Sequence, residues 1–265
     1  MENTPDTEQR YYPDVIAASI DILGFGRLIE LDSERAFRAA AWLVGNVLLD
    51  KAVRADGGGP DISLYERSAY FGDSCYLFGD TGADLRDQAT CLAAKCASLL
   101  YVGLSGGYSP SKLLVPLRIG IARGDLRVGT IRVGERRQEL RLGSAMLKAH
   151  RLQEAQVWLG GAVALDVPPP SSNSDDFRLS YSVPRHQARW QRWMDSCSAL
   201  NWPKLSGIAS PLPGNKPVPF LHDLIEVMQP LAMPGMQAFD KWQNTIHFAR
   251  HTASCVGSAT HVPRT

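Results

Sequence analysis

The run Ser19-Ile20-Asp21-Ile22-Leu23-Gly24-Phe25-Gly26 constrains the chain most, because an apolar strand here ends in an acid and a glycine-containing turn. A second acid follows at Gly72-Asp73, between two further strand-like runs. Two carboxylates with open coordination positions suit Mg²⁺ or Mn²⁺ bound to a triphosphate. Each motif alone has a simpler interpretation, since Asp21 could cap the turn that follows it and Asp73 could be an ordinary turn residue.

The spacing of apolar residues predicts alternating strands and helices, and therefore an α+β fold. Strands or strand-like runs are expected at 15–25, 62–71, 75–78, 115–122, 126–133 and 157–165. Helices are expected at 33–52, 84–102 and near 144–156. The first helix is predicted to begin at a Ser33 cap and to bury Phe37, Ala41, Val44 and Leu48. The second is predicted to bury Leu85, Ala89, Leu92, Cys96 and Leu99.

Composition favours a soluble cytoplasmic protein. The 265 residues carry 28 Lys and Arg against 27 Asp and Glu, so the overall charge predicts neither a nucleic-acid nor a membrane partner. No segment has the length of a membrane span, the N-terminus does not resemble a signal peptide, and the five cysteines lack metal-site spacing. The predicted parts are a polar segment at 1–13, a main domain at 14–166, a proline-rich linker at 167–176 and an extension at 177–265.

Two later motifs follow the acids in order, Leu117-Arg118-Ile119-Gly120-Ile121-Ala122-Arg123-Gly124-Asp125 and Gly143-Ser144-Ala145-Met146-Leu147-Lys148-Ala149-His150-Arg151-Leu152. Together the motifs resemble those of class III nucleotidyl cyclases. The shortened later motif, with Ala199-Leu200-Asn201-Trp202-Pro203 and Lys241-Trp242-Gln243-Asn244-Thr245 in the extension, resembles the pyrimidine cyclases of bacterial Pycsar antiphage systems. The resemblance implies a ferredoxin-like core, with an antiparallel-rich sheet and helices, plus a C-terminal extension that packs on or near this core.

The same resemblance implies a function. A homodimer with composite active sites would convert UTP, or failing that CTP, to the 3′,5′-cyclic monophosphate and pyrophosphate, and this product would activate a separate effector protein. Asp21, Asp73 and the backbone carbonyl of Ile22 would hold two divalent metal ions, Mn²⁺ or Mg²⁺. The phosphates would be cradled by the backbone amides of Leu23, Gly24, Phe25 and Gly26.

Arg151 stands at the position of the family's transition-state arginine, and a guanidinium suits the charge that builds on the α-phosphate. It could instead be a surface residue paired with Glu154. The asparagine that orients the ribose in the family falls at Leu147, so ribose positioning is left to another group.

The base-reading positions depart from the purine cyclases. Those enzymes carry a lysine and an acid where this chain has Ala69 and Leu140, so purine recognition loses its usual polar pair. Strand alternation places Tyr65 and Arg67 on the same face as Ala69, and either could contact a pyrimidine. Two alternatives remain: a purine nucleotide cyclase with the same metal acids, and a catalytically inactive, nucleotide-binding regulator.

Overall fold

The structure is a computed structural model that describes residues 6–48, 68–105, 113–133, 136–169, 177–179, 181–184, 197–205, 225–226, 229 and 239–258. Its strands are β1 (Asp6–Ile22), β2 (Ser68–Phe71), β3 (Ser74–Phe78), β4 (Leu117–Val133), β5 (Arg136–Leu142), β6 (Gly160–Ala164), β7 (Arg178–Leu179) and β8 (Cys197–Leu200). The helices that position the site are α1 (Phe25–Leu31), α2 (Ser33–Leu48), α3 (Leu85–Ser105), α4 (Ser144–Ala155), α6 (Trp202–Leu205) and α8 (Phe239–Ser258).

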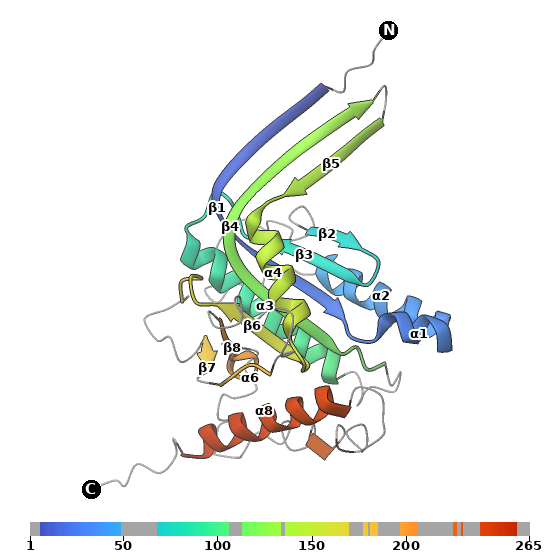
Figure 1. Ribbon diagram of the computed structural model, residues 1–265, viewed down its shortest axis with the longest axis vertical. Helices are drawn as coiled ribbons and strands as arrows, with labels where there is room; N and C mark the ends of the chain where they lie inside the picture. The colour runs from blue at the N-terminus through green and yellow to red at the C-terminus, as the bar shows by residue number, and fades with distance from the viewer. Residues whose placement is uncertain are drawn as a thin grey trace, which may run out of the picture.

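The strands of the described residues form one sheet in the order β2-β3-β1-β4-β6-β8-β7, and β5 also pairs with β4. The pairing of β4 with β6 is parallel, and the other pairings are antiparallel. The long strands β1 and β4 run side by side through the centre of the molecule (Figure 1). The predicted α+β class, with a mostly antiparallel sheet and helices, is confirmed.

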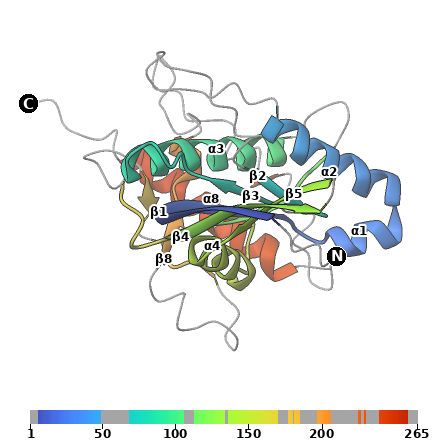
Figure 2. The ribbon, with the colours of Figure 1, turned by 90° about the horizontal axis from the view of Figure 1, so that it is seen from above.

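Helices cover both faces of this sheet. Figure 2 shows α2 and α3 on one face and α4 on the other. The helix α4 lies directly on β4, because a Cβ atom added at Gly120 would lie 2.1 Å from the carbonyl oxygen of Ala149. A side chain at position 120 would therefore push α4 away from the sheet. Gly120 of the Leu117–Asp125 motif thus permits the close packing of α4 on β4.

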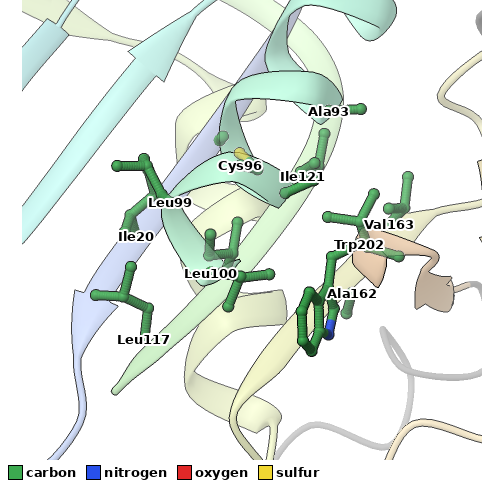
Figure 3. Packing of buried hydrophobic residues seen from close by; sticks show 14 of the residues in the cluster. Ile20, Ala93, Cys96, Leu99, Leu100, Leu117, Ile121, Ala162, Val163 and Trp202 are labelled. Carbon is green, nitrogen blue, oxygen red and sulfur yellow. The ribbon is translucent and has the colours of Figure 1, made fainter. Parts of the chain in front are cut away.

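The helix α3 buries an apolar face against the sheet. Ala93, Cys96, Leu99 and Leu100 face the core together with Ile121 of β4 (Figure 3). The predicted face is largely confirmed, since Ala89, Leu92, Cys96 and Leu99 are all buried and Leu85 is partly buried. This helix holds β1 in place from the side opposite α4.

The predicted face of the first helix is wrong. Phe37 is 73% exposed, and the buried side chains of α2 are instead Ala36, Ala39, Leu43 and Val47. Both sets recur at helical spacing, so periodicity alone does not choose between them. The predicted cap is also displaced by one residue, because the side chain of Asp32 accepts a hydrogen bond from the Arg35 amide at 2.9 Å.

Two predicted strands, 115–122 and 126–133, form the single strand β4. Arg123 and Gly124 stay extended because they pair with Ile16 and Val15 of β1. The outer half of β4 then continues between β1 and β5 as an arm that extends from the sheet (Figure 1).

Two strands among the described residues after 176 extend the same sheet. Strand β8 pairs with β6, and β7 pairs with β8. Helix α8 packs against the core through Phe248, whose ring centroid lies 4.5 Å from that of Trp158 and 5.2 Å from that of Tyr181. The C-terminal helix is therefore attached next to the beginning of β6.

Candidate functional site

The two acids of the sequence motifs lie together where β1 ends. Asp21 pairs with Ser74 across β1 and β3, and the Ser74 hydroxyl donates a hydrogen bond to Asp21 Oδ1 at 3.1 Å. The next residue, Ile22, donates its amide to the carbonyl oxygen of Asp73 at 3.3 Å. The hairpin of β2 and β3 thus holds Asp73 beside the end of β1, and we call this place the Asp21–Asp73 corner.

The two carboxylates repel each other in this corner. The pKa of Asp73 is raised above its ordinary value of 3.8, first by burial and then by the negative charge of Asp21. A hydrogen bond from its own backbone and the positive charge of Arg118 act in the opposite direction. Ionisation of Asp73 therefore costs free energy. A cation bound between the two acids would offset the part of this cost that comes from their repulsion.

Arg118 places a positive charge beside the two acids. It faces Asp21 in the register of β1 and β4, and its Nη2 donates to Asp21 Oδ2 at 2.7 Å. The pair is well shielded, since the side chains are only 16% and 13% exposed. The buried Nε of Arg118 has no hydrogen-bond partner among the described residues. A buried N–H without a partner is costly, so an acceptor placed at this donor would stabilise the site.

The role of Arg118 is absent from the sequence predictions, although a signal is present. Its neighbours Leu117 and Ile119 are fully buried in the centre of the sheet. A charged residue inside such a strand needs a buried partner of opposite charge. The strand pairing that makes Asp21 this partner is a property of the fold and cannot be read from β4 alone.

The turn after β1 is only partly free to bind phosphate. The amide of Leu23 donates to the carbonyl of Pro116 at 2.8 Å, so it cannot serve in the predicted cradle. Gly24 adopts a left-handed conformation with φ of 76° as the N-terminal cap of α1. The hydrogen bonds of α1 begin with the Leu28 amide, which leaves the first-turn amides of Phe25 and Gly26 outside the helix ladder.

Strands β2 and β5, which carry the predicted base-reading positions Ala69 and Leu140, contact each other within the chain. Ala69 of β2 is half-buried, and Leu140 of β5 is 40% exposed. Next to Leu140, Arg141 donates through Nη1 to the carbonyl of Ser68 at 3.2 Å, which ties β5 to the residue before Ala69. Apolar side chains therefore stand at both positions. The other two predicted base contacts, Tyr65 and Arg67, lie outside the described residues.

Arg151 lies half-buried on α4, the helix that packs on β1 and β4 from the face opposite α3 (Figure 2). Glu154, its alternative partner, lies 3.6 Å from His150 through Oε1 and Nε2. Leu147, at the ribose-orienting position, is 48% exposed on the same helix. The charges that act on Asp73 in the structure come from Asp21 and Arg118.

The donor set of the Asp21–Asp73 corner fits a hard divalent cation that shares its coordination with phosphate oxygens. Carboxylate and carbonyl oxygens are ligands that Mg²⁺ accepts, and Mg²⁺ commonly takes one or two carboxylates together with substrate phosphates. The described residues contain no group of three or more His, Cys, Asp or Glu side chains that could enclose a metal. None of the helices in this part of the chain is long and apolar enough to cross a membrane.

Comparisons with known proteins bear on the fold. No protein-family model matches the sequence, and no curated protein matches it. A bacterial light-regulated adenylyl cyclase is similar in structure, with a TM-score of 0.52, 15% identity, and alignment over 93% of this chain and 58% of that protein. The chain has the class III nucleotidyl cyclase fold.

Two further structures with this fold align less closely. The adenylyl cyclase CyaB from P. aeruginosa gives a TM-score of 0.46 and 16% identity over 60% of this chain and 80% of that protein. The guanylyl cyclase Cya2 gives 0.48 and 14% identity over 73% of this chain and 91% of that protein. Identities of this size do not identify a substrate.

Proposed function

We propose that this chain is a metal-dependent nucleotidyl cyclase that acts on a pyrimidine ribonucleoside triphosphate, with UTP preferred over CTP. The observation that carries the proposal is the Asp21–Asp73 corner, where two repelling carboxylates stand beside the buried, partly unpaired guanidinium of Arg118. Acids that repel each other are suited to a divalent cation, and an arginine beside them is suited to phosphate.

The reaction needs few groups from the protein. The ribose 3′-oxygen forms a bond to the α-phosphorus, the bond from this phosphorus to the pyrophosphate oxygen breaks, and the hydroxyl proton passes to solvent. Asp21, Asp73 and the Ile22 carbonyl would hold two divalent metal ions, which would neutralise charge on the phosphates and favour ionisation of the 3′-hydroxyl. The Arg118 guanidinium binds the phosphate chain, and the amides of Phe25 and Gly26 bind phosphate oxygens at the turn.

A second subunit completes the site in this proposal. Arg151 acts on the α-phosphate of the partner's nucleotide, as the class III resemblance implies. Exposed leucines on β5 and α4 support association of two copies, because Leu140, Leu142 and Leu147 are 40%, 63% and 48% exposed. Exposed apolar side chains of this size are stabilised when another protein surface buries them.

The pyrimidine preference rests on the base-reading positions. Ala69 and Leu140 cannot hydrogen-bond the edge of adenine or guanine, so the usual reason for purine selection is absent. The product would be a cyclic mononucleotide messenger for a separate effector in antiphage signalling. A second candidate, an inactive nucleotide-binding regulator, is favoured by the exposed Leu147 at the ribose-orienting position.

Product identification tests the proposal. The purified protein is incubated with Mn²⁺ and each of the four ribonucleoside triphosphates, and the products are identified by mass. We expect cUMP, with cCMP as the second product, and no cyclic product from an Asp21→Asn variant. Cyclic purine nucleotides alone would leave a cyclase and refute the pyrimidine assignment. Nucleotide binding without a cyclic product would favour the inactive regulator.

A further inference from the structure

The helix α8 is fastened to the segment between α4 and β6. Asn244 donates through Nδ2 to the carbonyl of Val157 at 2.7 Å. One residue later, the hydroxyl of Thr245 accepts the amide of Leu159 at 2.9 Å. Trp242 and Ile246 of the same helix are buried in the core. The first two turns of α8 are therefore fixed relative to the start of β6.

The start of β6 is the neighbour of the Asp21–Asp73 corner. Gly160 opens β6 and pairs with Arg118 of β4, and Arg118 in turn pairs with Asp21 of β1. Figure 1 shows the N-terminal end of α8 on the side of the sheet where β4 begins. The anchored turns of α8 thus lie at the end of the sheet that carries the acids.

Lys241 lies on the anchored face of α8. It precedes Thr245 by one helical turn, and the Thr245 hydroxyl donates to the Lys241 carbonyl at 2.7 Å. The pKa of the half-buried Lys241 is lowered, mainly by burial and then by the positive charge of Arg118, whereas the negative charge of Asp21 opposes this. Lys241 therefore shares the electrostatic environment of the Arg118–Asp21 ion pair.

The charges of these groups balance only while both acids are free. Asp21 and Asp73 carry two negative charges, and Arg118 and Lys241 carry two positive charges. When a divalent cation occupies the acids, the carboxylates no longer neutralise the arginine and the lysine. Two partly buried cations next to a metal favour binding of a polyanion.

We propose that Lys241 of the C-terminal helix binds the triphosphate of the nucleotide together with Arg118 of the same subunit. The inference rests on the proposed cyclase function and gives the C-terminal extension a part in the active site. The two side chains differ in their contribution: Arg118 offers directional donors, and Lys241 offers a point charge on a flexible stem.

The test measures binding of inorganic tripolyphosphate to the full chain by calorimetry in excess MgCl₂. We expect Lys241→Met to weaken binding about tenfold or more, because it removes a charge-assisted contact and keeps the aliphatic stem. Lys241→Arg should bind nearly as the unmodified chain does. Arg250→Met is the matched control, since Arg250 is an exposed cation on the same helix and its loss should leave binding unchanged.

The outcomes separate this inference from the cyclase proposal. Equal binding by the Lys241→Met variant and the unmodified chain would overturn the inference, as would an equal loss in the Arg250→Met variant or no tripolyphosphate binding at all. Lys241→Gln provides a second neutral variant if Met lowers the melting temperature. With nucleotide as substrate, we expect KM to rise more than kcat falls. Absence of cyclic product from the unmodified chain would refute the cyclase proposal instead.

Discussion

Arg118 and Asp21 form an ion pair across the two central strands, with 2.7 Å between Nη2 and Oδ2 and little exposure of either side chain. The guanidinium occupies one oxygen of an acid that the proposed reaction needs for metal. Metal binding and this ion pair are therefore coupled.

Replacement of Asp73 by Asn should stabilise the protein and inactivate it. The raised pKa of Asp73 means that its ionised form destabilises the fold, so the neutral amide should raise the melting temperature by about 2 °C in EDTA at pH 7.5. Turnover should fall about 10³-fold, because a metal ligand is lost. Thermal unfolding and product formation measure the two effects.

The difference in stability between the Asp73→Asn variant and the unmodified chain should depend on pH. Because the pKa of folded Asp73 is raised above 3.8, the advantage of Asn over Asp should be absent at lower pH and grow as the pH rises through the folded-state pKa. Added Mg²⁺ should reduce it at neutral pH. Asp87→Asn, at an exposed acid in the first turn of α3, should give no stabilisation. A variant at position 73 that is less stable at every pH would contradict the proposed repulsion.

Removal of Arg118 should leave Asp21 buried without its partner. Arg118→Met should lower the free energy of unfolding by about 3 kcal/mol. Arg123→Met is the matched control on the same strand, because the Arg123–Asp14 pair is 38% and 37% exposed and should contribute less than about 1 kcal/mol. Urea unfolding in EDTA gives both values. Mg²⁺ should stabilise the Arg118→Met variant more than the unmodified chain, and an equal response would contradict the coupling.

The residues around the Asp21–Arg118 pair differ in whether the sequence alone predicts their place in the site. Apolar patterns place Asp21 and Asp73 at the ends of strand-like runs, and the resemblance of the ordered motifs to those of class III cyclases implies that the two acids lie together. Arg118 and Lys241 could not be predicted in this way, since their approach to Asp21 depends on the pairing of β4 with β1 and on the docking of α8. The side of α2 that faces the core was likewise undetermined, because two apolar sets share the same helical period.

If each active site contains residues from both subunits, two different inactive variants should restore activity when they form a mixed dimer. Asp73→Ala and Arg151→Ala should each be inactive alone, yet a mixture that exchanges subunits should recover about a quarter of the unmodified activity, because half of the dimers then carry one intact site. Mass spectrometry of intact dimers checks the exchange. If heterodimers form and the mixture stays as inactive as its components, Arg151 does not act across a subunit boundary.

Competition among all four triphosphates at equal concentration should favour the pyrimidines, because discrimination is a ratio of specificity constants. Quantification of the cyclic products by mass provides the measurement. The double variant Ala69→Lys, Leu140→Asp should lose pyrimidine preference, since both changes introduce the polar groups of purine cyclases into apolar positions. A dominant cyclic purine nucleotide from the unmodified chain would refute the base assignment.

The attachment of α8 beside β6 has a consequence for synthesis of the protein. A ribosome releases the segment with Asp21 long before the helix with Asn244 and Thr245, which fasten to the carbonyl of Val157 and the amide of Leu159. A nascent chain can thus pair β1 with β4 while the end of the sheet next to Gly160 still lacks its covering helix. The acids are in place early, and their surroundings are completed only when the C-terminal helix has been made.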